Sequence, residues 1–344
     1  MKQTIKAKHV HQGMFIHLRA VQEEYPDQKW LDLWETRWPF YRNWYLRDGY
    51  SARPGYLTCL EKLQTYMPEL LPFHERLAAL AGGGDLEARY LSLWKPPAYM
   101  SGCSQVVWDR RNDLALIRNY DYSPELFEGV FMQTNWLQPV MGIVDCSWGL
   151  LDGVNASGLS LSLTFGGRNV VGEGFGIPLV QRYVLETCTT TQEAIEKLCS
   201  IPIHMAYNVT VMDEKGFFAT VYLSPDRPPV VTENRVGTNH QITVEWEDYA
   251  RMSGTTERHM FLLESIGENG LTEEEMVARF LKEPLYNTKY DQHFGTIYTA
   301  VYHPRERTVK LIWPGKSYSF GFDDFHEMKI VVNVNKTVNK LLVE

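Results

Sequence analysis

The character of the chain changes at Cys103, and this change constrains the fold more than any other feature. Before it, apolar residues recur near helical spacing between about 57 and 80, and a Gly-rich stop follows at 81–85. After it, short β-rich runs separated by turn residues predict strands at 104–108, 114–122, 129–136, 140–149 and 158–165. The sequence therefore predicts a helical segment over 1–102 and a strand-rich domain over 103–344.

Two pairs of helices interrupt the later strands. The first pair begins at Pro178 and at Thr190-x-x-Glu193, and the second is expected at 252–266 and 272–282, where Thr272-x-x-Glu275 repeats the capping-box pattern. Further strands are expected at 205–213, 217–223, 229–238, 295–303, 308–314 and 328–334. Because strands and helices come in blocks, we expect an α+β protein with antiparallel sheets and helices layered outside them.

Charge and composition exclude several classes of protein. The net charge of −8 and the lack of a basic block argue against a nucleic-acid partner. No apolar run is long enough for a membrane span or a secretory signal. The five cysteines form no CxxC pair and the ten histidines include no HExxH motif, so we expect no disulfide, metal or cofactor, and a cytoplasmic location.

Cys103 is the candidate nucleophile. It lies between Gly102 and Ser104 at the start of the first clear strand, although a lone cysteine is more often a small buried apolar residue. A hairpin turn separates this strand from Arg118 and Asp121, and antiparallel pairing would bring both close to the sulfur. A cation beside the sulfur would favour the thiolate, and a carboxylate there could orient an amine. The alternative is that Arg118 and Asp121 form an ordinary surface ion pair.

Two Gly-flanked turns offer side-chain amides to such a site. Asn155 lies in the turn Asp152-Gly-Val-Asn-Ala-Ser-Gly158, and Asn239 lies in Gly237-Thr-Asn-His240. Asn in such a turn is usually present for its left-handed backbone. The functional alternative is that one or both amides donate to an oxyanion.

These motifs, followed by Ser253-x4-Arg258, occur in the order seen in the choloylglycine hydrolase and penicillin V acylase family. The chain resembles more closely its self-processing relatives, the acyl-coenzyme A:6-aminopenicillanic acid acyltransferase group, over most of residues 60–320. The resemblance implies a four-layer αββα sandwich, the N-terminal-nucleophile (Ntn) hydrolase fold. It also implies a helical pro-segment, 1–102, that is cut from the catalytic domain between Gly102 and Cys103.

The resemblance also assigns roles to the site residues. Cys103 would be the nucleophile, with Arg118 and Asp121 beside it. Asn155 and Asn239 would lie near the oxyanion, and Arg258 would be a supporting charge. The cut would free the α-amine of Cys103, whose ordinary pKa of about 7.7–8.0 suits it to accept the thiol proton.

The expected function is therefore that of a self-processing cysteine amidohydrolase or acyltransferase. It would act on small-molecule linear amides or acyl thioesters through an acyl-Cys103 intermediate, as a heterodimer of its own two fragments. Two alternatives remain open: a papain-like Cys/His hydrolase, and a non-catalytic binding protein with an uncut chain. The sequence does not identify the acyl group or the amine, does not separate hydrolase from transferase, and does not fix any homo-oligomeric state.

Overall fold

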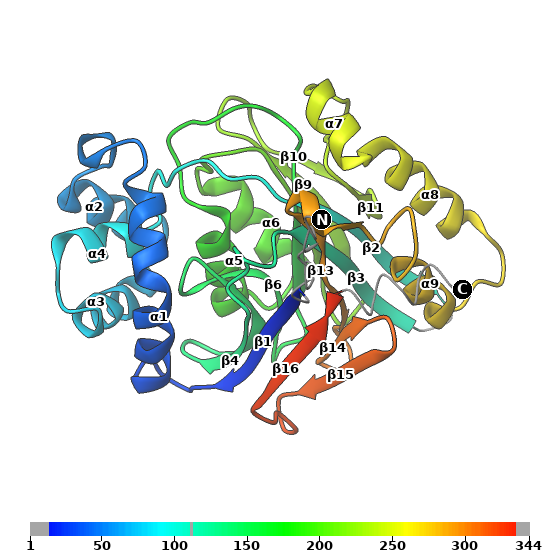
Figure 1. Ribbon diagram of the computed structural model, residues 1–344, viewed down its shortest axis with the longest axis horizontal. Coiled ribbons are helices and arrows are strands. Elements are labelled where there is room, and N and C mark those ends of the chain that lie inside the picture. The colour runs from blue at the N-terminus through cyan, green and yellow to red at the C-terminus, as the bar shows by residue number, and fades with distance from the viewer. Residues whose placement is uncertain (1–13, 111–112, 335–344) are drawn as a thin grey trace, which may run out of the picture.

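Two β-sheets face each other in the middle of the molecule, and helices cover their outer sides (Figure 1). The computed structural model describes residues 14–110 and 113–334. Within these ranges, β2 of the smaller sheet contacts β7 of the larger one. The α+β class and the αββα order of layers predicted from the sequence are confirmed.

The larger sheet has the strand order β10-β9-β8-β7-β6-β5-β4-β1-β16. Its strands are β1 (Phe15–Gln22), β4 (Val130–Asn135), β5 (Pro139–Asp145), β6 (Gly149–Asn155), β7 (Ser160–Phe165), β8 (Tyr207–Met212), β9 (Phe218–Leu223), β10 (Val230–Thr232) and β16 (Met328–Asn333). Helices α5 (Ile177–Thr187) and α6 (Thr191–Ser200) cover it, with α5 against β6 and α6 against β9. The predicted capping box of α6 is present, because Thr190 and Glu193 bond reciprocally.

The smaller sheet has the order β11-β2-β3-β13-β14-β15, with β12 paired to β13. Its strands are β2 (Gly102–Arg110), β3 (Asp113–Tyr122), β11 (Val236–Gly237), β12 (Thr288–Lys289), β13 (Phe294–His303), β14 (Thr308–Trp313) and β15 (Lys316–Gly321). Helices α7 (Glu247–Ser253), α8 (Thr255–Gly267) and α9 (Glu273–Phe280) lie on its outer side. A short 3-10 helix, Tyr290–Gln292, precedes β13.

Side chains alternate between two cores along β2. Cys103 and Val107 belong to the large core shared with the other sheet, whereas Val106 and Trp108 pack with Leu262 of α8 in a second, smaller core. This alternation follows from the two-residue period of a strand. It places the sulfur of Cys103 on the side of β2 that faces the other sheet.

Two of the secondary-structure elements expected from the sequence are each divided in two in the structure. The strand expected at 229–238 is split, because β10 joins the larger sheet and β11 joins the smaller one. The helix expected at 252–266 is interrupted at Gly254, which has a φ of +61° and separates α7 from α8. The chain therefore crosses between the two sheets immediately before the predicted Asn239 turn.

The N-terminal segment is helical over much of its described length. Its helices are α1 (Gln28–Tyr45), α2 (Tyr56–Tyr66), α3 (Leu71–Leu80) and α4 (Asp85–Leu91), with 3-10 turns at Tyr50–Ala52 and Pro68–Leu70. In Figure 1 these four helices form a group at one end of the molecule. None of the helices in the described ranges is long and apolar enough to cross a membrane.

A strand in this segment corrects the expectation of a helical segment over residues 1–102. β1 lies inside the larger sheet, parallel to β4 on one side and antiparallel to β16 on the other. Its buried Ile16, Leu18 and Ala20 alternate with exposed Phe15 and His17, the pattern of a strand with one covered face. The two parts divided at residue 102 therefore share a sheet.

Candidate active site

Cys103 is the second residue of β2 and its side chain is fully buried. Pairing with β3 places Gly102 opposite Asp121 and Cys103 opposite Tyr120. The Cys103 sulfur lies 3.3 Å from Nη2 of Arg118. Burial raises the pKa of the Cys103 thiol, and the nearby Arg118 charge opposes part of that rise. The sulfur is therefore a thiol beside a cation, and it needs a base to ionise.

Arg118 is fixed by partners that sequence reasoning missed. Its guanidinium forms a fully buried ion pair with Asp152 and donates to the Tyr298 hydroxyl at 2.9 Å. Asp152 also accepts from Tyr298 at 2.7 Å and from Tyr302 at 2.5 Å. The sequence signal for Asp152 is weak: it directly follows two leucines at a position expected to begin a turn, whereas the structure has it inside β6.

Arg258 of α8 holds the backbone of Cys103 from the other side of β2. Its Nη1 donates to the Cys103 carbonyl at 2.6 Å and to the Ser104 hydroxyl at 2.7 Å. Its Nη2 donates to Oδ1 of Asn239 at 2.7 Å. Oδ2 of Asp121 lies 3.5 Å from Nη1, so the guanidinium joins three of the predicted site residues.

Asn239 and Asp121 complete this cluster. Oδ1 of Asn239 accepts the Cys103 backbone N–H at 3.0 Å, and its Nδ2 donates to the Phe165 carbonyl at 3.1 Å. Oδ1 of Asp121 accepts from the Thr296 hydroxyl at 2.7 Å, whereas its buried Oδ2 has no hydrogen-bond donor among the described residues. Burial raises the pKa of Asp121, and Arg258 opposes this rise. The structure thus gathers Cys103, Arg118, Asp121, Asn239 and Arg258 in one place.

Asn155 is the exception, and the interpretation of its amide as an oxyanion donor is wrong. Its Nδ2 donates to the carbonyls of Leu185 and Cys188 at 2.9 and 2.8 Å, at the end of α5. Its Oδ1 accepts from the backbone N–H groups of Ser157 and Leu159. Because both amide hydrogens are used, Asn155 caps a helix and stabilises its own turn, the alternative that its sequence context also allowed.

The residues just before Cys103 are tightly held. A Cβ on Gly102 would lie 2.2 Å from Cζ of Phe294, so any larger residue here would require the Phe294 ring to move. The Tyr249 hydroxyl of α7 donates to the Ser101 carbonyl at 2.6 Å. Among the described residues, no histidine is hydrogen-bonded to Cys103, and His240 instead lies 2.9 Å from the Thr255 hydroxyl. The described arrangement therefore offers no Cys/His pair.

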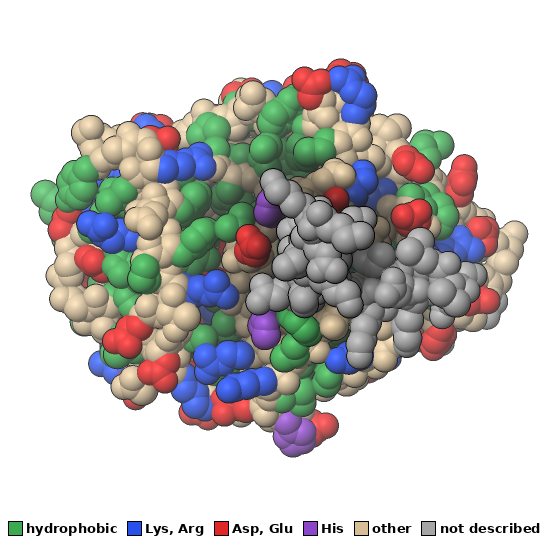
Figure 2. All heavy atoms as spheres, viewed as in Figure 1, with side chains coloured by type: hydrophobic (Ala, Val, Ile, Leu, Met, Phe, Trp, Pro, Cys, Tyr) green, Lys and Arg blue, Asp and Glu red, His purple; other side chains and the backbone are tan. Residues whose placement is uncertain are grey.

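A cavity of about 510 Å³ lies beside the segment that precedes Cys103. It is lined by Phe40 and Trp44 of α1, by residues 98–100, and by Tyr122 and Phe294. On the face viewed in Figure 2, hydrophobic side chains gather between the N-terminal helices and the middle of the molecule. The N-terminal segment thus supplies one wall of the cavity.

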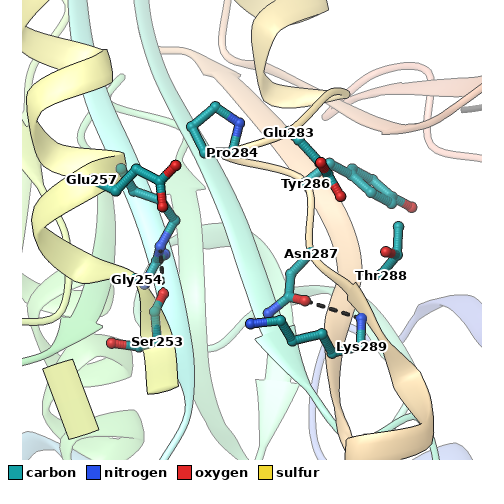
Figure 3. Close-up of a pocket in the computed structure, with 10 residues that line it drawn as sticks. Ser253, Gly254, Glu257, Glu283, Pro284, Tyr286, Asn287, Thr288 and Lys289 are labelled. Carbon is teal, nitrogen blue, oxygen red and sulfur yellow. Dashed lines mark hydrogen bonds between the residues drawn. The ribbon is translucent and has the colours of Figure 1, made fainter. Parts of the chain in front are cut away.

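A second, more polar pocket of about 380 Å³ lies on the helix side of the smaller sheet. Figure 3 shows Ser253 and Glu257 on one side of it, facing Glu283 and Lys289 on the segment that leads to β13. Arg258 also lines this pocket. Arg258 thus lies between this pocket and the backbone of Cys103. In the described ranges, no group of three or more His, Cys, Asp and Glu side chains could hold a metal ion.

Two facing sheets between helical layers, with a cysteine near the start of a central strand, define the Ntn hydrolase fold. The chain belongs to the acyl-coenzyme A:6-aminopenicillanic acid acyl-transferase family, whose model matches residues 108–318. This is a family of amide hydrolases and acyltransferases. The matched region begins after Cys103, so the N-terminal segment lies outside it. No curated protein matches the chain.

Solved structures with similar folds share little sequence with this chain. A mutant of the conjugated bile acid hydrolase from Clostridium perfringens is 12% identical, with 66% of this chain and 96% of that chain covered and a TM-score of 0.47. The N-acylethanolamine-hydrolyzing acid amidase ortholog from Caenorhabditis elegans is 18% identical, with 67% and 99% covered and a TM-score of 0.43. Penicillin V acylase from Agrobacterium tumefaciens is 14% identical, with 64% and 86% covered and a TM-score of 0.41.

Proposed function

We propose that the protein is a self-processing cysteine amidohydrolase or acyltransferase that cuts its own chain between Gly102 and Cys103. It then acts on linear amides or acyl thioesters through an acyl-Cys103 intermediate. One observation carries this proposal: the buried sulfur lies 3.3 Å from Arg118, while Asn239 and Arg258 hold the N–H and carbonyl of the same residue. A structural cysteine needs none of these partners.

The first reaction is cleavage of the precursor. The Cys103 sulfur attacks the carbonyl carbon of Gly102, the C–N bond between the two residues breaks, and a thioester to Gly102 forms. Water then hydrolyses the thioester, leaving a carboxylate on Gly102 and a free thiol and α-amine on Cys103. The Tyr249 hydrogen bond to the preceding carbonyl restricts how the scissile segment can move.

The new α-amine supplies the base that the uncut site lacks. Asn239 already accepts from this nitrogen, and the open Oδ2 of Asp121, opposite Gly102 in the ladder, can accept a second hydrogen. With an ordinary pKa of about 7.7–8.0, the amine can take the thiol proton near neutral pH. Amine and thiol on one residue then replace the Cys/His pair of other hydrolases.

In turnover, the thiolate attacks the carbonyl carbon of the substrate and gives a tetrahedral oxyanion. Nδ2 of Asn239 has a second hydrogen with no acceptor among the described residues, which makes it the candidate oxyanion donor. The Cys103 ammonium returns its proton to the leaving group as the intermediate collapses. Water or an acceptor amine then attacks the acyl-Cys103 thioester and releases the thiol.

Cys103→Ala tests both reactions at once. Intact-mass measurement of the purified wild-type protein should give two fragments, residues 1–102 and 103–344, whereas the variant should stay one chain and turn over no N-acyl amide. Cys146→Ala, which removes another buried thiol, is the matched control and should be cut normally. A wild-type chain that stays uncut yet turns over substrate at full rate would contradict the scheme. A wild-type chain that stays uncut and binds an N-acyl amide without turning it over would favour the binding-protein alternative.

A further inference from the structure

Two hydroxyl groups contact the short segment that ends at the bond between Gly102 and Cys103. The Tyr249 hydroxyl donates to the Ser101 carbonyl at 2.6 Å, and the Ser101 hydroxyl lies 4.0 Å from the Cys103 sulfur. Both side chains are buried, since only 3% of Tyr249 and 4% of Ser101 is exposed. Ser101 is thus bound through its backbone to α7 and through its side chain to the candidate nucleophile.

The Tyr249 hydroxyl is held in place by the packing of its ring. The ring meets Phe165 edge-on with centroids 5.1 Å apart, and it stacks on Trp246 with centroids 5.4 Å apart. The carbonyl of Phe165 also accepts from Asn239, so Phe165 supports two of the groups in the site. Because the donor is already fixed, it can hold the Ser101 carbonyl in one orientation at little further cost in entropy.

The contact between the Ser101 hydroxyl and the Cys103 sulfur spans Gly102. A sulfur held toward Ser101 is directed back along the chain, toward the Gly102 carbonyl carbon that it has to reach in cleavage. Burial raises the pKa of the Cys103 thiol, and the hydrogen bond with Ser101 is one of the contacts that oppose this rise. The contact therefore affects both the direction and the ionisation of the thiol.

Cleavage of the chain demands more of these contacts than later turnover does. In cleavage the sulfur forms a bond to the Gly102 carbonyl carbon, the bond from that carbon to the Cys103 nitrogen breaks, and the thiol proton ends on that nitrogen. A peptide bond inside a folded chain cannot diffuse into place, so the backbone itself has to present the carbonyl to the sulfur. Once the bond is broken, Ser101 belongs to the other fragment and is no longer joined to Cys103 through the chain.

We infer that Ser101 and Tyr249 are positioning residues for cleavage between Gly102 and Cys103 and have no part in later turnover. Tyr249 fixes the backbone of Ser101, and the Ser101 hydroxyl holds the sulfur beside the carbonyl that it attacks. This role rests on the proposed function, because it exists only if the chain cuts itself. It assigns to the N-terminal segment a side chain that acts on the nucleophile before the two fragments are separated.

Pulse labelling of the full chain during cell-free synthesis, followed by a denaturing gel, measures the rate of cleavage. Ser101→Ala and Tyr249→Phe should each slow the loss of the uncut chain by about tenfold or more, because the sulfur and the carbonyl then meet less often in a reactive geometry. Ser101→Thr keeps the hydroxyl and should be cut faster than Ser101→Ala. Equal rates for these two variants would show that the hydroxyl is not what matters at this position, and would overturn the inference.

Two matched controls remove other buried hydroxyls. The Ser92 hydroxyl donates to the Arg89 carbonyl at 2.7 Å, and the Tyr90 hydroxyl lies 3.3 Å from the Ser147 hydroxyl. Ser92→Ala and Tyr90→Phe should both be cut at the wild-type rate, because neither side chain contacts the segment before Cys103. Cleavage slowed equally in the controls would contradict a specific role for Ser101 and Tyr249.

A second measurement, on the processed protein, separates positioning from a general defect of the site. After cleavage is complete, iodoacetamide should alkylate Cys103 in Ser101→Ala and Tyr249→Phe at the wild-type rate, as measured by mass spectrometry of the Cys103 peptide. Alkylation slowed as much as cleavage would overturn the inference, because the substitution would then have disturbed the whole site. Cleavage of either variant at the wild-type rate would overturn it and leave the proposed function standing, whereas a wild-type chain that is never cut would remove both.

Discussion

At the scale of single residues, we expect the proposed reactivity of Cys103 to depend on how firmly Arg118 is held. The guanidinium donates to the Leu163 carbonyl, the Tyr298 hydroxyl and Asp152, which leaves Nη2 directed at the sulfur. A flexible arginine would lose side-chain entropy each time it met the thiolate, whereas this one is already in place. We therefore expect Asp152 to act as a positioning residue in the proposed reaction, although it does not touch Cys103.

Asp152→Asn tests this positioning role. The variant should lower kcat for a thioester or amide by about tenfold or more and raise the apparent pKa of Cys103 alkylation, because a loosened Arg118 favours the thiolate less. It should also lower the free energy of unfolding by about 3–5 kcal/mol, since a buried arginine loses its carboxylate. Asp109→Asn, at a partly exposed ion pair with Arg235, is the control and should change neither. A variant that loses stability but keeps the wild-type alkylation profile would leave Asp152 a purely structural role.

The cysteine–arginine neighbourhood could be predicted from the sequence because a hairpin is a local structure, and the two residues lie close on either side of one turn. The support of Arg118 could not be predicted, because Tyr298 reaches it from β13, about 180 residues away along the chain, and Tyr302 of the same strand binds its partner Asp152. Asn155 shows the opposite error. Its turn motif was recognised, but the sequence does not show that the end of α5 lies beside it and takes both amide hydrogens.

At the scale of elements, the turn between β5 and β6 depends on a buried acid. Cys146 and Ser147 have φ angles of +55° and +73°, a conformation that is costly for residues with a Cβ. The Glu128 carboxyl accepts the Ser147 N–H and helps to keep this turn in place. The capping boxes at Thr190 and Thr272 could be predicted from local sequence. This turn could not, because it has no Asn-Gly pair and the carboxyl that stabilises it comes from Glu128, 19 residues earlier in the chain.

The Glu128 carboxyl should make stability fall as the pH rises. Burial, and after it the charge of Asp145, raises the pKa of Glu128 in the folded protein well above its ordinary value of 4.5. Between the unfolded and the raised folded pKa the unfolded chain ionises while the folded chain stays protonated, so the free energy of unfolding falls as the pH rises above about 4.5. Glu128→Gln should remove much of this slope, so that the stability of the variant relative to the wild type is higher at pH 8.5 than at pH 5. Denaturant unfolding at both pH values measures this, and an unchanged difference would show that Glu128 does not titrate in that range.

At the scale of the whole molecule, the N-terminal segment belongs to the same folded body as the region that contains Cys103. β1 fills the place between β4 and β16, and α1 supplies Phe40 and Trp44 to the cavity wall. Helical periodicity near 57–80 correctly indicated the helices of this segment. The strand at Phe15–Gln22 was overlooked because it stands alone before a run of helices, and only pairing with strands more than a hundred residues away makes it part of a sheet.

Because β1 is an interior strand, a cut between Gly102 and Cys103 should not separate the two fragments. Gel filtration of the processed protein should give one particle containing both, while a denaturing gel resolves residues 1–102 from 103–344. Leu18→Asp, which places a charge at a fully covered position of β1, should release the shorter fragment after the cut, because the burial of an unpaired carboxylate opposes the pairing. Arg19→Asp, at the adjacent outward-facing position, is the matched control and should keep the fragments together. If the wild-type fragments part without denaturant, the cavity wall from α1 would be lost with them, and the cavity could serve only the uncut chain.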